Sequence, residues 1–154
     1  MFANGAYIRK TDMAFSNNYW TVSCWFKKTS SVTSAYETML GLTRINGADA
    51  NKKFSLYVYS NKIGCVGEQT TNPNITTFDT SKWHHACLVK DGGSFTYYMD
   101  GTSIKTFSNS NNLSDCTDFV VGGRAGAEDA TYNGNPWGGY LSDVRLYVTA
   151  FSAD

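Results

Sequence analysis

The chain has 154 residues, of which 42% are hydrophobic and 15% aromatic, and its acidic and basic side chains are equal in number. This length fits one domain, and the composition is too apolar for a disordered chain. The zero net charge and scattered Lys and Arg argue against a nucleic-acid partner, and no apolar run is long enough for membrane insertion.

Apolar residues recur with a period of two almost throughout, which predicts strands rather than helices. In chain order the predicted strands are Ala6–Arg9, Trp20–Lys28, Glu37–Leu42, Phe54–Tyr59, Ile63–Gly67, His84–Lys90, Phe95–Met99, Ser103–Phe107, Phe119–Gly122 and Tyr140–Val148. Turns rich in Asn, Ser, Thr and Gly separate these strands. Many short strands at even spacing predict an all-β antiparallel sandwich or jelly roll.

The stretch Trp83–Gly101 is the most informative part of the sequence. It predicts a strand, a tight turn at 91–93, a second strand and a second turn at Asp100-Gly101. Asp-Gly pairs supply the positive φ that hairpin turns require. A Trp before the strand, a His pair at its start and an Asp-Gly at the end of the hairpin form a recognisable pattern.

These residues resemble the laminin-G-like and pentraxin branch of the concanavalin A-like jelly rolls. The resemblance extends nearly over the whole chain, because Phe2–Gly5 is similar to the family's opening strand and Gly138–Asp154 to its closing strand. The closing motif is also similar to modules of bacteriophage tail and bacterial surface proteins. The resemblance implies an antiparallel β-sandwich. We expect residues 1–154 to be a single domain excised from a longer protein.

The branch is built mainly for binding, so the resemblance implies non-catalytic recognition of a glycan or another cell-surface ligand. It also implies an extracellular, cell-surface or virion-surface location and neighbouring domains of a larger protein as partners. The alternative function is a structural or assembly module of a virion or surface fibre that binds no small ligand. A glucanase-like hydrolase is the third hypothesis.

The sequence lacks the carboxylate arrangement of a glucanase. Such enzymes need two carboxylates about 5 Å apart, whereas Glu37, Glu68 and Glu128 each stand alone on their segments.

The neighbours His84 and His85 point to opposite faces of a strand and cannot hold one ion together. We therefore expect no enzyme activity and a structural role for both histidines.

Four cysteines permit two disulfides in three pairings. Pentraxins carry a bridge between strands that resemble 21–27 and 84–90 of this chain, which would join Cys24 to Cys87. In that comparison, however, the bridging position falls on Ser23, and Cys24 points to the opposite face. We therefore expect free thiols that are mostly buried.

The family resemblance implies a structural calcium ion as the one candidate cofactor. In relatives the ion ties the first strand to the last, and Asp143 begins a run similar to the family's closing-strand ligand motif. Asn4 would supply the second ligand, since calcium accepts amide and carbonyl oxygens as well as carboxylates. The alternative is an ion pair between Asp143 and Arg145.

The loop Gly122–Gly139 is the longest irregular stretch, and long loops often carry function. Tyr132 and Trp137 offer flat faces for a sugar ring, and the loop's glycines let backbone approach a ligand. The polar partners in the predicted ligand site are Arg124, Glu128, Asp129, Asn133 and Asn135. The alternative is an ordinary rim loop with Trp137 folded into the core. Should this site fail, Tyr98 on the concave sheet is the next candidate.

Overall fold

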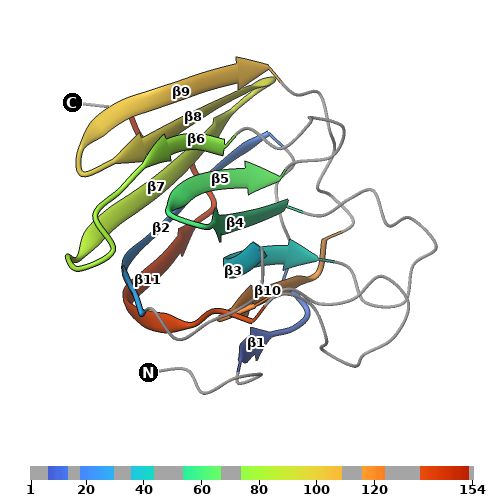
Figure 1. Cartoon of the computed structure of the whole chain (residues 1–154). Coiled ribbons are helices and arrows are strands. Elements are labelled where there is room, and N and C mark those ends of the chain that lie inside the picture. Colours follow the sequence, from blue (N-terminus) through green and yellow to red (C-terminus); the bar gives the residue numbers. More distant parts are fainter. Residues whose placement is uncertain are drawn as a thin grey trace.

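The computed structural model describes residues 7–13, 18–29, 36–43, 54–66, 74–108, 116–123 and 136–152. Within these residues the chain forms strands in two antiparallel sheets and no helix (Figure 1). Across the part of the chain that is described, no helix is long and apolar enough to cross a membrane. The prediction of an all-β sandwich is confirmed.

One sheet has six strands, and neighbouring strands are antiparallel. Its order is β1 (Ile8–Lys10), β10 (Asp118–Val121), β3 (Tyr36–Thr43), β4 (Phe54–Tyr59), β5 (Lys62–Val66) and β6 (Asn74–Thr77). Side chains on both faces of β4 are buried, from Phe54 to Val58. Neither face of this sheet is exposed to solvent at β4.

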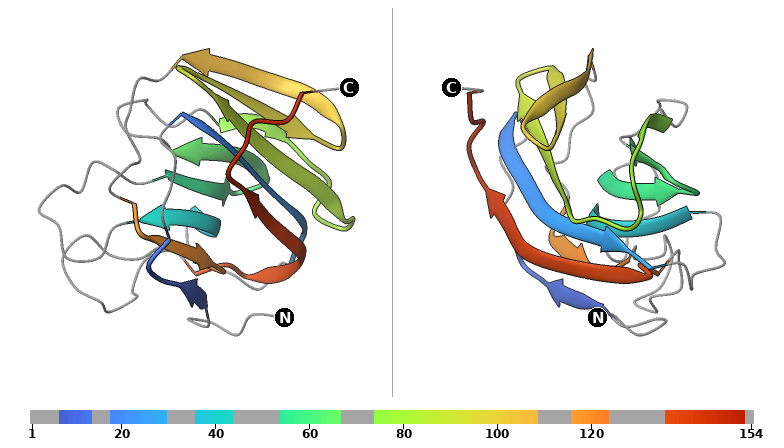
Figure 2. Two further views of the ribbon diagram at one scale, coloured as in Figure 1. Left: turned by 180° about the vertical axis from the view of Figure 1, so that it is seen from behind. Right: turned by 60° about the vertical axis from the view of Figure 1, so that its left-hand side comes forward.

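The other sheet has five strands, also antiparallel. Its order is β11 (Gly139–Tyr147), β2 (Tyr19–Lys28), β7 (His84–Asp91), β8 (Ser94–Met99) and β9 (Thr102–Ser108). In Figure 2 the strands β2 and β11 run side by side and curve around the six-stranded sheet. The face of this sheet that points away from the six-stranded sheet is called the outer face below.

The core fills the space between the two sheets. Trp20 of β2 contacts Phe54 of the six-stranded sheet, with ring centroids 5.1 Å apart, and Phe95 of β8 at 5.7 Å. Burial alternates in the second half of β2, since Cys24 and Phe26 are buried while Trp25 between them is exposed. This alternation is the period of two that the sequence shows.

Turn chemistry explains why the hairpins close where they do. Asp100 and Gly101 both have positive φ, at 50° and 79°, which is the type I′ turn that an Asp-Gly pair favours. Gly92 has a φ of 57° in the turn between β7 and β8. The hairpin predicted from Trp83 to Gly101 is therefore confirmed, with Asp91 as the last residue of its strand.

Each predicted strand has a counterpart within one or two residues of its predicted ends. Among the strands of the described residues, β6 is the one that the sequence does not predict. Its sequence, Asn-Ile-Thr-Thr, offers a single apolar residue, and the strand lies at the edge of the sheet with β5 as its one partner. Four residues with one apolar side chain carry too little alternation to predict a strand.

The four cysteines are free thiols, as predicted. Ser23 is the residue opposite Cys87, and Cys24 is opposite Ala86, so the side chains of Cys24 and Cys87 lie on opposite faces of the sheet. Burial raises the pKa of Cys24 to about 12 and that of Cys87 to about 11. Both groups are therefore protonated and unreactive at neutral pH.

Candidate functional site

The histidine at the start of β7 clamps the hairpin to the preceding loop. His84 Nδ1 lies 2.7 Å from Asp100 Oδ2, and Nε2 lies 2.9 Å from the carbonyl oxygen of Asp79. The other oxygen of Asp100 accepts a 2.8 Å hydrogen bond from the backbone N–H of His85. A carboxylate and a carbonyl both only accept, so both bonds form together when both ring nitrogens carry hydrogen.

Both ring nitrogens of His84 therefore have hydrogen-bond partners within the protein. Its ring also packs against Phe26 and Phe78, with centroids 5.6 and 5.4 Å apart. Burial acts to raise the pKa of Asp100, but its hydrogen bonds from the two histidines outweigh burial and hold that pKa below its usual value. The structural role predicted for His84 is confirmed, and His85 faces the opposite side of the strand.

The predicted ligand loop is described at its two ends. Gly122 has a positive φ of 88°, and its carbonyl oxygen accepts a 3.0 Å hydrogen bond from the backbone N–H of Trp137. The chain therefore returns to the point where it left β10 before it enters β11. The predicted ligand residues Arg124, Glu128, Asp129, Tyr132, Asn133 and Asn135 lie outside the described residues.

Trp137 is not the exposed stacking platform that one interpretation of the loop predicted. Its side chain is 1% exposed and packs edge-on against Phe26, with centroids 6.2 Å apart. Gly139 makes room for it, because a Cβ at Gly139 would lie 2.8 Å from the indole and would also meet the carbonyl oxygen of Lys27. The alternative of a ring folded into the core is therefore correct.

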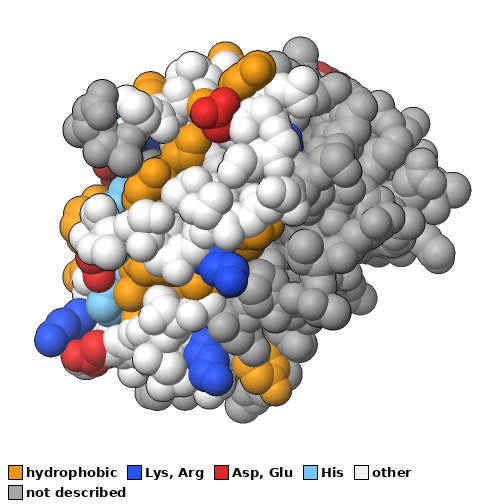
Figure 3. All heavy atoms as spheres, turned by 90° about the horizontal axis from the view of Figure 1, so that it is seen from above, with side chains coloured by type: hydrophobic (Ala, Val, Ile, Leu, Met, Phe, Trp, Pro, Cys, Tyr) orange, Lys and Arg blue, Asp and Glu red, His pale blue; other side chains and the backbone are white. Residues whose placement is uncertain are grey.

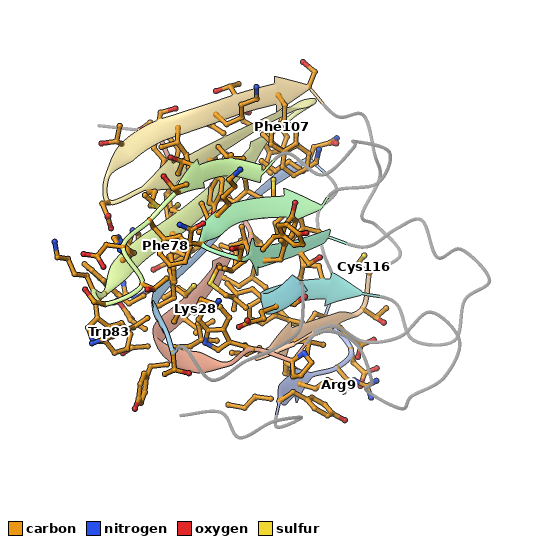
Figure 4. All side chains as sticks on the ribbon, viewed as in Figure 1. Arg9, Lys28, Phe78, Trp83, Phe107 and Cys116 are labelled. Atoms are coloured by element: carbon orange, nitrogen blue, oxygen red, sulfur yellow. The ribbon has the colours of Figure 1, made fainter. Side chains whose placement is uncertain are left out.

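A buried ion pair joins the two sheets beside Trp137. Lys28 Nζ of β2 lies 3.5 Å from Glu37 Oε1 of β3, and Glu37 Oε2 accepts a hydrogen bond from the N–H of Gly138 at 3.3 Å. Burial raises the pKa of Glu37, although Lys28 and the Gly138 N–H act in the other direction. In Figure 4, Lys28 and Phe78 lie between the sheets. This carboxylate is thus a structural anchor for the loop end.

Asp143 stands in an ion pair rather than in a cluster of ligands. It sits at an irregularity of β11 with a φ of 48°, and its Oδ1 lies 2.7 Å from Nε of Arg145. The described residues hold no group of three His, Cys, Asp or Glu side chains that could bind a metal. Asn4 lies outside them. Calcium binding by Asn4 and Asp143 stays a prediction, with Arg145 as the competing cation.

Exposed aromatic rings gather on the outer face of the five-stranded sheet, at the end where β7 begins. Trp25, Trp83 and Tyr140 are 42%, 44% and 38% exposed. The rings of Trp83 and Tyr140 lie 6.2 Å apart, and the ring of Trp25 lies 5.3 Å from that of His85. We call Trp25, Lys27, Trp83 and Tyr140 together the outer-face patch.

Strand pairing fixes the arrangement of the outer-face patch. Tyr140 of β11 is opposite Lys27 of β2, while Trp25 has Ser142 of β11 on one side and His85 of β7 on the other. Figure 3 shows hydrophobic and histidine side chains at the left edge of the molecule, and Trp83 lies at the left edge in Figure 4. Strands β2 and β11 and the residue before β7 therefore place three exposed aromatic side chains on one face of the sheet.

The outer-face patch was missed in the sequence, although a signal for it exists. Trp20 and Trp25 are five positions apart on one predicted strand, an odd offset, so they must face opposite sides. Placing Trp20 in the core would have placed Trp25 outside. The partners of Trp25 could not be found in this way, because they depend on the register between strands.

The Laminin_G_3 family, described as the concanavalin A-like lectin/glucanases superfamily, matches residues 2–154. No curated protein matches the sequence.

Several solved structures share the fold over nearly the whole chain. A CBM40 of the Ruminococcus gnavus IT-sialidase, bound to α2,3-sialyllactose, has a TM-score of 0.70 and 16% identity, covering 95% of this chain and 94% of its own. A heptameric SAP-like pentraxin from Limulus polyphemus has a TM-score of 0.72 and 19% identity, covering 96% and 71%.

Domain 4 of AbnA, a GH43 extracellular arabinanase from Geobacillus stearothermophilus in complex with arabinotriose, has a TM-score of 0.71 and 18% identity, covering 99% of this chain and 71% of that one. At these identities the comparisons establish the fold alone. Together with the family match over residues 2–154, they show that the chain belongs to the concanavalin A-like lectin/glucanases superfamily and has its laminin-G-like jelly roll.

Proposed function

We propose that this domain is a non-catalytic module that recognises a glycan. The observation that carries the proposal is the match in size and fold to the R. gnavus CBM40, which covers 95% of this chain and 94% of that module. The AbnA domain adds a second sugar-bound example. Because one fold hosts many functions, the proposal also needs a surface suited to sugars, and the outer-face patch supplies exposed rings.

The buried carboxylates support a non-catalytic role. Glu37 is directed between the sheets and held by Lys28, and Asp118 is held by Arg9 at 3.0 Å. A glycosidase needs its carboxylate pair facing a substrate groove. Neither of these two groups is free to play that part.

The proposed setting is extracellular, on a cell or virion surface, with the module joined to neighbouring domains. The predicted loop residues Arg124, Glu128, Asp129, Tyr132 and Asn133 remain part of the proposal. Trp137 would serve such a loop as its buried anchor rather than as a contact.

A glycan array, followed by calorimetric titration of the best saccharide, tests the proposal. We expect saturable binding to at least one class of saccharide and no new reducing ends when the protein is incubated with that saccharide or with β-glucans. Absence of binding on the array would refute glycan recognition and favour the structural module. Release of reducing ends would refute the non-catalytic role.

A further inference from the structure

The outer face of the five-stranded sheet is half covered by the chain itself. Beyond β11 the chain folds back over β2, where Thr21 Oγ1 donates a 2.9 Å hydrogen bond to the carbonyl oxygen of Thr149 and accepts one from the N–H of Phe151. The rings of Tyr147 and Phe151 pack 4.6 Å apart. As a result Thr21 and Val89 are buried although they face outward.

The other half of the same face carries the outer-face patch, which no described segment covers. Its three rings keep between 38% and 44% of their surface in water. Burying a large aromatic ring is favourable, so a protein ordinarily covers such rings or uses them for binding. Trp25 and Tyr140 lie on the adjacent strands β2 and β11, and Trp83 directly precedes β7, so the three rings come from neighbouring parts of one face of the sheet.

Among the described residues, the ion pairs around the outer-face patch leave one cation, Lys27, without a carboxylate partner. The nearby acids each have a basic partner, since Asp143 pairs with Arg145 and Asp79 with Lys82. Asp100 is bound by His84. Lys27, in the middle of the outer-face patch, has no carboxylate partner among the described residues.

Lys27 is also placed where a ligand lying on the rings would meet it. It stands opposite Tyr140 across β2 and β11, and Trp83 lies directly before β7, next to His84, the partner of Phe26. Trp83 and Tyr140 therefore come from opposite sides of Lys27, and their rings contact each other over this residue. A Lys side chain next to exposed aromatic rings favours an anion that also has an apolar face.

We propose that the outer-face patch binds an acidic pyranose, a sugar whose ring stacks on the exposed aromatic side chains while its carboxylate pairs with Lys27. The inference rests on the proposed glycan recognition and names its site and ligand class. Uronic acids and sialic acids share this chemistry, and the test below separates the two sources. Neutral sugars would stack on the same rings but would gain nothing from Lys27.

The test measures calorimetric affinities for two matched pairs of probes. Trigalacturonate is compared with its methyl ester, and 3′-sialyllactose with lactose, so that each pair differs in a carboxylate. We expect the protein to bind at least one acidic probe about tenfold or more tightly than its neutral counterpart, and that preference to shrink as salt is raised. Equal affinities within both pairs would overturn the assignment of an acidic ligand.

Four variants and two controls locate the site. Trp25→Ala, Trp83→Ala and Tyr140→Ala should each weaken the acidic probe about tenfold or more, and Lys27→Met should abolish the preference for the acidic member of the pair. Tyr19→Ala removes an exposed ring at the far end of β2, and Lys105→Met removes an exposed ammonium on β9. Both controls should bind like the parent.

Each outcome separates the site from the broader function. If the parent binds a saccharide and the folded outer-face variants bind it equally well, this site is wrong while glycan recognition stands. If the parent binds neither these probes nor any array saccharide, the proposed function itself fails. Melting temperatures check folding, and should Trp83→Ala not fold, Trp25→Ala and Lys27→Met still decide the matter.

Discussion

Replacing Trp137 tests whether this ring belongs to the core or to a binding surface. The side chain is 1% exposed and packs on Phe26. An aromatic side chain of this kind removes about 200 Å² from water, which at about 25 cal/mol per Å² amounts to about 5 kcal/mol as an upper estimate. We therefore expect Trp137→Ala to lower the free energy of unfolding by about 3–5 kcal/mol.

Trp137→Phe refines the prediction. Among the described residues the buried indole Nε1 has no hydrogen-bond partner, and an unsatisfied buried donor costs about 1–3 kcal/mol. Phenylalanine loses part of the packing but also removes that penalty. We therefore expect it to lower the free energy of unfolding by only about 1 kcal/mol.

The assay is urea denaturation followed by circular dichroism, with Trp25→Ala as the matched control. Trp25 is 42% exposed on the outer face, and its replacement should lower the free energy of unfolding by clearly less than that of Trp137, because less of its surface is buried. If Trp137→Ala were as stable as the parent and instead lost glycan affinity, our placement of this ring in the core would be refuted.

Three further predictions concern the backbone, pH and calcium. Gly139→Ala should lower stability by about 1–3 kcal/mol in urea denaturation, because its Cβ would collide with the Lys27 carbonyl, whereas Gly93→Ala, with open space around its Cβ, should change it far less. The pKa of Asp100 is lowered on folding, so its stabilising effect is present above its unfolded value and is lost as the pH falls through its folded value. Asp100→Asn should accordingly reduce the fall in melting temperature at acid pH. An unchanged fall would contradict a stabilising role for the hydrogen bonds of Asp100 with His84 and His85. A calcium site at Asp143 predicts that chelator lowers the melting temperature and that Asp143→Ala melts at the chelated value with or without calcium; no effect of chelation would remove calcium from the account.

The fold was largely predictable because its signals are local. Alternating apolar residues specify strands, and Asp100-Gly101 specifies its own turn through the positive φ that both residues adopt. The absence of a Cys24–Cys87 bridge followed from the resemblance to pentraxins combined with side-chain parity, since Cys24 and Cys87 are one position out of register. β6 escaped prediction because a short polar edge strand is defined by its partner β5 rather than by its own sequence.

The candidate site was less predictable because it depends on contacts between distant segments. Trp137 follows a proline within a glycine-rich stretch, where no alternation indicates which way the ring points. Its burial is set by Phe26, far away in the sequence. The contact between Trp83 and Tyr140 likewise requires β7, β2 and β11 to lie in this order in the sheet.

The most direct test of the central claim follows the four tryptophan indole N–H signals in a nitrogen–proton correlation spectrum during titration with the acidic saccharide that binds. The chain has four tryptophans, so each signal can be assigned by a single Trp→Phe variant. We predict that the signals of Trp25 and Trp83 shift with the ligand, while those of the buried Trp20 and Trp137 stay in place. Saturable binding that leaves the Trp25 and Trp83 signals unmoved would contradict recognition at the outer-face patch.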